Sequence, residues 1–224
     1  NVLIVDGNLS TPNVGIHLNS PEVPVCLNHI LAKKAETHEA VYEHESGIKI
    51  IPSSLSIKEL RKLKPENMKN LKEDFKALGD YILIDSAAGL GMEAISAMES
   101  ADELIIVTNP EMPAITDALK TIKLAESMKI PVKGIIITRV KKNKSEMQPE
   151  VVKDMLEVAI LGSIPEDSAV QEALNLKDAL VHTHPKSNSA RAYKEIAAKL
   201  IDVDYDSKKD RHPIWIRMFK RRGY

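Results

Sequence analysis

Residues 81–111 read YILIDSAAGLGMEAISAMESADELIIVTNPE, with two apolar runs separated by a small-residue turn and a segment of helical character. The first run starts at Tyr81 and meets Asp85, and the second starts at Leu104 and stops at Thr108-Asn109-Pro110. Unbroken apolar runs bounded by turn residues predict strands buried on both faces. A carboxylate at the C-terminal end of such a strand, followed by glycines and a helix, lies where open α/β sheets bind ligands. A lone aspartate can equally cap the next turn, so both interpretations stay open.

Composition and charge exclude several classes of protein. The chain has 224 residues, 28% of them charged, with a net charge of −1, which argues against a general nucleic-acid coat. Aromatic residues make up only 4%, too few for a platform that stacks single-stranded bases. The only cysteine, Cys26, can form neither an internal disulfide nor a C-x-x-C metal site. No apolar run approaches the roughly 18 residues of a membrane span, and we expect a reducing cytoplasmic setting.

Strand-like and helix-like segments alternate along the whole chain. Alternation of this kind predicts an α/β fold, a mostly parallel sheet with helices on both faces. We expect one domain over residues 1–202, followed by a charged linker over 203–210 and a tail over 211–224. The expected strands lie near residues 2–5, 47–52, 81–84, 104–107, 133–139 and 158–161. The expected helices lie near 27–31, after Ser56 in a capping box, from Pro65 to Leu78, after Pro113, after Pro149, over 169–174 and after Ser187 or Ser189.

The segment around Asp85 resembles a known family. Its strand, its D-[ST]-x-A-G pattern and the later T-N-P-E resemble the Walker B and switch II segment of the MinD/ParA family of P-loop ATPases. The stretch LGSIPED, residues 161–167, is similar to the family's G-x-I-P-x-D loop. The resemblance spans essentially the whole chain, and it implies ATP and Mg²⁺ as cofactors. It also implies that Asp85 binds the magnesium shell through water and senses the γ-phosphate.

The start of the chain resembles the family's switch I, a strand followed by D-x-D-L. Asp6 matches the first acid, and Asn8 stands where the second acid is expected. The resemblance gives that second position a catalytic role in placing the attacking water. An amide keeps one acceptor oxygen but carries no charge, so Asn8 puts hydrolysis in doubt. Alternatively, Asp6 and Asn8 only cap a turn.

The resemblance also implies residues that contact the nucleotide. Thr138 and Arg139 match the end of the family's base-recognition strand, although an ordinary strand end with a solvated arginine is the alternative. The expected cofactor-binding residues are Asp6, Gly89, Glu111, Thr138, Arg139, Pro165, Glu166 and Asp167. Glu111 is expected to reach the nucleotide region of a partner subunit.

One family motif is missing. Family members carry a glycine-rich P-loop before switch I, and no G-x-x-x-x-G-K-[ST] occurs in this sequence. The chain begins Asn1-Val2-Leu3, inside an expected strand, so we expect a longer native protein whose upstream part supplies the P-loop and a central strand. A degenerate member that never binds ATP is the alternative.

The tail differs in composition from the rest. Helical spacing after Pro213 predicts a short amphipathic helix with a bulky apolar face and basic flanks, which suits an anionic membrane surface. A docked terminal helix, a partner-binding peptide and a disordered end are the alternatives. The resemblance favours the membrane, because MinD proteins carry such a helix. The expected membrane-binding residues are Ile214, Trp215, Arg217, Met218, Phe219, Lys220 and Arg221.

Taken together, these features predict a MinD-like ATPase that acts as an ATP-dependent, membrane-associated spatial switch. We expect a cytoplasmic protein, peripheral at the inner face of the cell membrane, which forms an ATP-dependent homodimer and responds to an activating partner. The alternatives are a non-hydrolysing scaffold and a ParA-like DNA segregation ATPase. Near-neutral charge speaks against nucleic acid, and the single cysteine disfavours the related iron–sulfur carriers.

Overall fold

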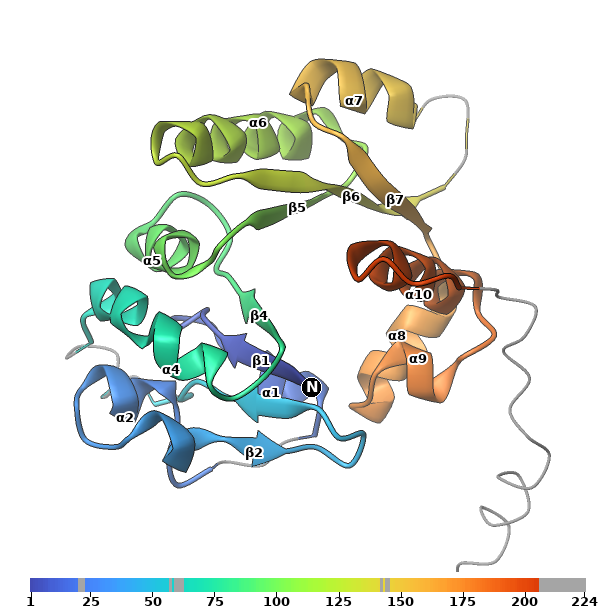
Figure 1. Cartoon of the computed structure of the whole chain (residues 1–224). Coiled ribbons are helices and arrows are strands. Elements are labelled where there is room, and N and C mark those ends of the chain that lie inside the picture. Colours follow the sequence, from blue (N-terminus) through green and yellow to red (C-terminus); the bar gives the residue numbers. More distant parts are fainter. Residues whose placement is uncertain (20–22, 57, 59–62, 142, 144–145, 206–224) are drawn as a thin grey trace, which may run out of the picture.

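The computed structural model describes residues 1–19, 23–56, 58, 63–141, 143 and 146–205, and its strands form two sheets (Figure 1). The first sheet has the order β2-β3-β1-β4 and the second the order β5-β6-β7. Every pair is parallel except β2 with β3. The prediction of an α/β fold with a mostly parallel sheet is therefore confirmed. The strands are β1 (Val2–Asp6), β2 (Tyr42–Glu43), β3 (Lys49–Ile51), β4 (Tyr81–Asp85), β5 (Leu104–Thr108), β6 (Val132–Val140) and β7 (Ile160–Pro165).

Helices cover both faces of the second sheet. Figure 1 shows α6 and α7 on one side of β5-β6-β7 and α10 on the other. The helices are α1 (Val14–His17), α2 (Leu27–Leu31), η1 (Thr37–Ala40), η2 (Pro65–Leu71), α4 (Lys72–Lys76), α5 (Met92–Ser100), α6 (Met112–Ser127), α7 (Pro149–Leu156), α8 (Ser168–Leu176), α9 (Leu180–Thr183) and α10 (Asn188–Leu200).

Some element boundaries differ from the sequence prediction. The single helix expected from Pro65 to Leu78 is a 3₁₀ helix, η2, that continues into the short α-helix α4. The strand β7 runs on through Gly162 to Pro165, where the sequence suggested a loop. The strand β2 and the short helices α1, η1 and α9 were not predicted. The helix expected after Ser56 and the tail over 211–224 lie outside the described residues.

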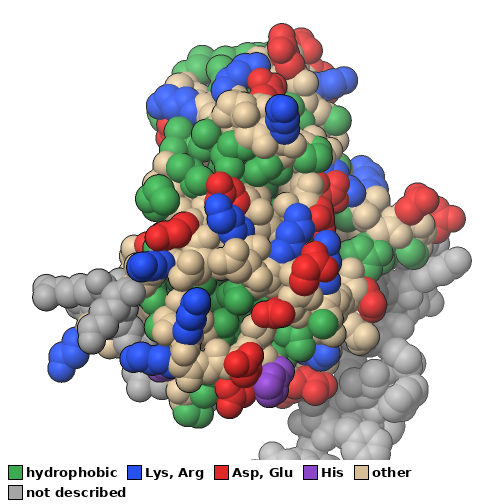
Figure 2. Space-filling view, turned by 60° about the vertical axis from the view of Figure 1, so that its left-hand side comes forward, with side chains coloured by type: hydrophobic (Ala, Val, Ile, Leu, Met, Phe, Trp, Pro, Cys, Tyr) green, Lys and Arg blue, Asp and Glu red, His purple; other side chains and the backbone are tan. Residues whose placement is uncertain are grey.

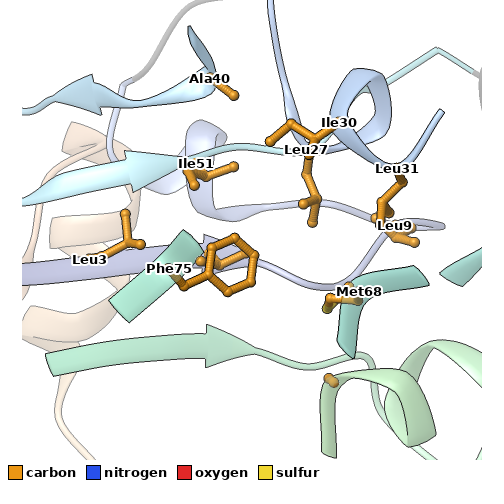
Figure 3. Close-up of a cluster of buried hydrophobic side chains, with 11 residues drawn as sticks. Leu3, Leu9, Leu27, Ile30, Leu31, Ala40, Ile51, Met68 and Phe75 are labelled. Carbon is orange, nitrogen blue, oxygen red and sulfur yellow. The ribbon is translucent and has the colours of Figure 1, made fainter. Parts of the chain in front are cut away.

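Two hydrophobic clusters stabilise the molecule. In the first, Leu3 of β1 and Ile51 of β3 meet Leu27 of α2, Met68 of η2 and Phe75 of α4 (Figure 3). The second lies under α6 and α7, and it contains Ile106, Ile115, Ala118, Ile122, Ile135, Ile137, Val152 and Leu156. Each cluster joins one sheet to its covering helices, which is how a two-layer domain buries its apolar faces.

The outer edges of β4 and β5 are open. Each strand has one neighbour, β1 for β4 and β6 for β5, and no other described strand pairs with them. Tyr81 and Leu83 of β4 are 49% and 51% exposed, and Val107 of β5 is 63% exposed. The prediction that both strands are buried on both faces is therefore wrong. An apolar run is buried on both faces only where neighbouring elements cover it, and these strands end their sheets.

The surface carries both signs of charge. On the face displayed in Figure 2, Lys and Arg side chains are interspersed with Asp and Glu side chains and with apolar groups. This mixture agrees with the net charge of −1. Within the described part of the chain, no helix has the length and apolar character needed to cross a membrane.

Candidate functional site

Asp6 and Asp85 end two neighbouring parallel strands, and the ladder of β1 and β4 pairs them directly. The chain continues from β1 through Gly7, whose backbone N–H donates to the Asp85 carbonyl oxygen at 2.8 Å. A Cβ on Gly7 would lie 3.0 Å from that oxygen, so the lack of a side chain lets the two strand ends approach closely. The structure therefore brings both sequence-predicted carboxylates to the edge of the sheet where α/β folds bind ligands.

Asp6 holds the loop that follows it. Its carboxylate accepts the backbone N–H of Asn8 at 3.3 Å, and of Asn13 and Val14 at 3.1 Å each. The side chain is buried, with 1% exposed. The pKa of Asp6 is raised to about 6: burial is the largest cause, the charge of Asp85 adds to it, and the backbone hydrogen bonds partly oppose both. Three donors already satisfy this carboxylate, so its first role is to shape the loop.

Asp85 has a different environment. Its carboxylate takes part in no hydrogen bond or ion pair with any described residue. Partial burial raises its pKa, and His17 opposes that shift. Because its oxygens are unused, Asp85 is the carboxylate of the pair that can accept hydrogen bonds from the water shell of a cation.

Asn8 uses its side-chain oxygen locally. The amide Oδ1 accepts the Thr11 backbone N–H at 3.2 Å and the Thr11 hydroxyl at 3.0 Å. This is the turn-capping arrangement typical of asparagine. The geometry favours the alternative that Asn8 caps a turn, and in this conformation the acceptor oxygen is not free to orient a water.

A contact that the sequence did not predict joins the loop after β1 to the helix after β4. The Ser10 backbone N–H donates to Glu93 Oε2 at 3.1 Å, and the Ser10 hydroxyl donates to Glu93 Oε1. Glu93 lies in the first turn of α5, where a carboxylate is also stabilised by the helix dipole. No spacing rule links residues 83 positions apart, so only the fold reveals that this loop contacts α5.

A second group of predicted residues gathers at the ends of β6 and β7. The Thr138 hydroxyl donates to the Thr108 carbonyl oxygen at 3.1 Å, which ties β6 to the end of β5. Arg139 Nε lies 3.4 Å from Glu166 Oε2. The Glu166 backbone N–H donates to the Val140 carbonyl oxygen at 3.0 Å. The predicted base-side residues are therefore adjacent in space.

Asp167 joins two helices. It is the N-cap of α8, where one oxygen accepts the Ala169 N–H at 3.1 Å, and the other accepts the Ser189 N–H at the start of α10 at 3.2 Å. The Ala169 bond is the largest of the effects that lower its pKa. The Ser189 hydroxyl donates to the Pro165 carbonyl oxygen at 2.9 Å. This carboxylate has a structural role whatever it binds.

The two remaining predicted residues stand apart from these groups. Gly89, in the turn after Asp85, has φ of +84°, and nothing lies within 4 Å of the place where its Cβ would be. Glu111 precedes α6 as its N-cap residue, and its side chain makes no capping bond. Both are exposed, and they lie in the segments that follow β4 and β5.

The residues fit part of a magnesium–nucleotide site. Paired carboxylates at strand ends supply the oxygen ligands and acceptors that Mg²⁺ prefers, usually through its retained waters. The sequence contains no P-loop motif, so the described residues include no glycine-rich P-loop that could hold the phosphates. No group of three or more potential metal-ligating side chains occurs among the described residues.

Comparison with known proteins agrees with this architecture. A family described as "ParA: NUBPL iron-transfer P-loop NTPase" matches residues 65–201. An uncharacterised ATP-binding protein of Methanocaldococcus jannaschii is 35% identical over 206 residues, covering 92% of this chain and 78% of that protein. The structure of the septum site-determining protein MinD with Mg-ADP from Pyrococcus horikoshii has a TM-score of 0.85 and 31% identity, over 89% of this chain and 82% of that chain.

A second archaeal structure gives the same result. The cell division ATPase MinD of Pyrococcus furiosus has a TM-score of 0.86 and 30% identity, over 90% of this chain and 85% of that chain. The fold and the strand-end carboxylates thus define a P-loop NTPase-like α/β protein. The chain belongs to the ParA/MinD family of P-loop NTPases.

Proposed function

We propose that this protein is a MinD-like ATPase that works as an ATP-dependent, membrane-associated spatial switch. The observation that carries the proposal is the in-register pair of Asp6 and Asp85 at the ends of adjacent parallel strands. MinD of P. horikoshii, a similar fold, was solved with Mg-ADP, which supports the same ligand here. The candidate base-side residues at the ends of β6 and β7 give the nucleotide a second point of contact.

In this proposal, the two carboxylates have separate roles. Asp85, whose oxygens are unused, accepts hydrogen bonds from magnesium-bound water and reads whether a γ-phosphate is present. Asp6 holds the following loop in shape through its three backbone bonds. The Ser10–Glu93 contact transmits a change in that loop to α5. Mg-ATP, when bound, would supply the phosphoryl group for hydrolysis and the positive charge of Mg²⁺ close to the two carboxylates.

The phosphate cradle is the part that these residues do not provide. The open edges of β4 and β5 support a site for one more parallel strand, and their exposed Leu83 and Val107 would gain cover from it. A strand that leads into a P-loop would place backbone amides and a lysine beside Asp85. The proposal therefore requires polypeptide carrying that motif to complete the site.

The test is Mg-ATP binding followed with a fluorescent nucleotide. We expect weak or no binding by residues 1–224 alone. We expect micromolar binding by a chimaera in which the strand and P-loop of a ParA/MinD-family ATPase are joined to Asn1. The matched control carries alanine in place of the P-loop lysine. If the folded chimaera binds no better than its control, the ATPase proposal is wrong.

Membrane association forms a separate part of the proposal. The tail residues Trp215 and Phe219 with Arg217 and Lys220 lie outside the described residues, so their support is the sequence pattern alone. ATP-dependent dimerisation would bring two weak tail helices together, and linked weak sites gain avidity. Anionic liposomes should pellet the full chain and not a chain that lacks residues 211–224. Equal pelleting of both would remove the membrane from the proposed function.

One observation favours a second function, a non-hydrolysing scaffold of the same family. The oxygen of Asn8 is occupied by Thr11, and an amide cannot take up a proton. The chimaera separates the two functions through phosphate release. A scaffold binds ATP without turnover, and the Asn8→Asp variant of the chimaera would then gain hydrolysis. An ATPase turns over ATP with Asn8 in place.

A further inference from the structure

A basic cleft lies between the end of α2 and the start of η2, and neither Asp6 nor Asp85 is among its described lining residues. Its volume is about 650 Å³, within the roughly 300–1,000 Å³ typical of small-molecule sites. Four lysines line it, and no described acidic residue is among its lining residues. These lysines are Lys33, Lys34, Lys58 and Lys64.

Among the described residues, no carboxylate neutralises the charge of the cleft. None of its four lysines forms an ion pair with an acidic residue in the described ranges. This distinguishes them from Lys72, Lys76 and Lys133, each of which meets a carboxylate. Four ammonium groups that share one concave surface repel each other and raise the local concentration of anions.

A second observation points to a ligand in the same place. Asn28, which lines the cleft, is 2% exposed. Its Oδ1 accepts the Ser54 N–H at 2.9 Å, which leaves its Nδ2 group as the donor, and Nδ2 has no hydrogen-bond partner among the described residues. A buried amide donor left unpaired costs roughly 1–3 kcal/mol. Because Nδ2 is itself buried, an oxygen atom of a bound molecule would satisfy it only after a small shift of the groups that cover it.

The walls add apolar surface and shape. Leu31, Ala32 and Leu63 line the same space. Asn67 lies at the cleft as well, and its Nδ2 reaches the Leu31 carbonyl oxygen at the long distance of 3.5 Å. A cleft that combines four ammonium groups, amide groups and aliphatic walls suits a compact anion that carries several charged oxygens.

We propose that this cleft binds a small molecule carrying phosphate groups, independently of the nucleotide site. Lysine ammonium groups bind phosphate as point charges without a fixed orientation. They therefore suit the several oxygens of a polyphosphate better than one planar carboxylate. The limited volume and the near-neutral charge of the chain favour a small ligand over a nucleic acid, whose backbone needs an extended basic surface.

The experiment uses the full chain and inorganic tripolyphosphate without magnesium, with binding measured by calorimetry. Amide chemical shifts locate the site. We expect binding with shifts at Asn28, Lys33 and Asn67, and a Kd that rises at least tenfold in the double variant Lys33→Gln/Lys64→Gln. The matched control is Lys129→Gln/Lys153→Gln, which removes one exposed lysine just after α6 and one exposed lysine in α7. This control should leave the Kd within twofold.

Each other outcome overturns the proposal. Absence of binding, or equal weakening in both double variants, would mean that the cleft holds no specific anion site. Shifts confined to the ends of β1 and β4 would place the anion at the nucleotide site instead. Citrate and a short DNA duplex serve as competitors of tripolyphosphate, compared at equal total charge. Displacement of tripolyphosphate by the duplex would identify a nucleic-acid surface. Because Asp85→Asn lies outside the cleft, it should leave tripolyphosphate binding unchanged, so this test is separate from that of the ATPase.

Discussion

Replacing Asp85 with asparagine should stabilise the chain at alkaline pH and not in acid. Burial and the charge of Asp85 raise the pKa of Asp6 from 3.8 to about 6, and burial raises the pKa of Asp85 too. A raised pKa means that the folded state binds protons more tightly than the unfolded state. The stability that the protonated Asp6 carboxyl gives the folded state is fully present below pH 3.8 and is lost as the pH rises through about 6.

The size of the effect follows from Asp6. A pKa moved from 3.8 to about 6 makes the ionised side chain cost about 3 kcal/mol of stability above neutral pH. Burial is the largest cause and Asp85 is a smaller one, so removing the Asp85 charge should recover about 1 kcal/mol at pH 8. At pH 4 the Asp6 carboxyl is mostly protonated in the folded chain, and the gain should disappear.

Urea unfolding at pH 4, 6 and 8 measures the difference. We expect the midpoint of Asp85→Asn to exceed that of the parent at pH 8 and to match it at pH 4. Asp102→Asn is a matched control with the opposite sign, because the ion pair with Lys72 lowers the pKa of Asp102. A variant that is no more stable than the parent at pH 8, or that gains equally at pH 4, would refute the proposed repulsion between the two carboxylates.

Three further substitutions test the packing and capping. Gly134→Ala should cost about 1–3 kcal/mol in urea unfolding, because its Cβ would lie 2.9 Å from the Ala159 carbonyl oxygen, whereas Gly91→Ala meets nothing within 4 Å and should cost less. Asp167→Ala should cost about 1–2 kcal/mol by removing the Ala169 and Ser189 bonds, and Asp167→Asn, which keeps one acceptor, should cost less. Ser187→Ala should lower stability by about 1 kcal/mol through loss of the α10 cap at Ala190, and hydrogen exchange should quicken at the start of α10; an unchanged rate would contradict that role.

The strand ends of the site could be predicted from the sequence alone. Asp6 and Asp85 each follow a short apolar run, and parallel strands of an α/β sheet present their C-terminal ends at one edge. The ladder pairs these two residues directly. The family resemblance, rather than this reasoning, implies that Arg139 and Glu166 contact a nucleotide, and the contact between their side chains was not predicted. Their roles toward a nucleotide remain proposals.

The extent of β7 could not be predicted, because its residues look like a turn. Gly162, Ser163 and Pro165 all favour loops, yet the strand runs through them. At Gly162 a Cβ would lie 2.5 Å from Ile196 Cγ1, so the glycine serves the close approach of α10 to the sheet. A glycine within a strand has this meaning only once the helix that crosses it is known.

The exposure of β4 could not be predicted from the sequence for a related reason. Composition indicates that Tyr81 and Leu83 belong in a strand, but their exposure depends on whether another element covers the face of the sheet to which they point. The Ser10–Glu93 contact is similar, since two polar residues far apart in sequence carry no shared pattern. Local chemistry predicts which elements form, whereas tertiary neighbours decide what each one touches.

The electrostatics of the strand ends connect stability to the proposed function. Two carboxylates with raised pKa values destabilise the chain at neutral pH, and no basic side chain among the described residues forms an ion pair with either. A hydrated Mg²⁺ beside Asp85 would favour the ionised form of both groups and would lower the pKa of Asp6. A ligand that binds only the folded state stabilises it by mass action. Burial, together with a smaller repulsion between the two carboxylates, costs the free chain stability, and a cation at Asp85 would oppose both effects; cation binding, and with it the nucleotide state, would in this way act on the loop held by Asp6.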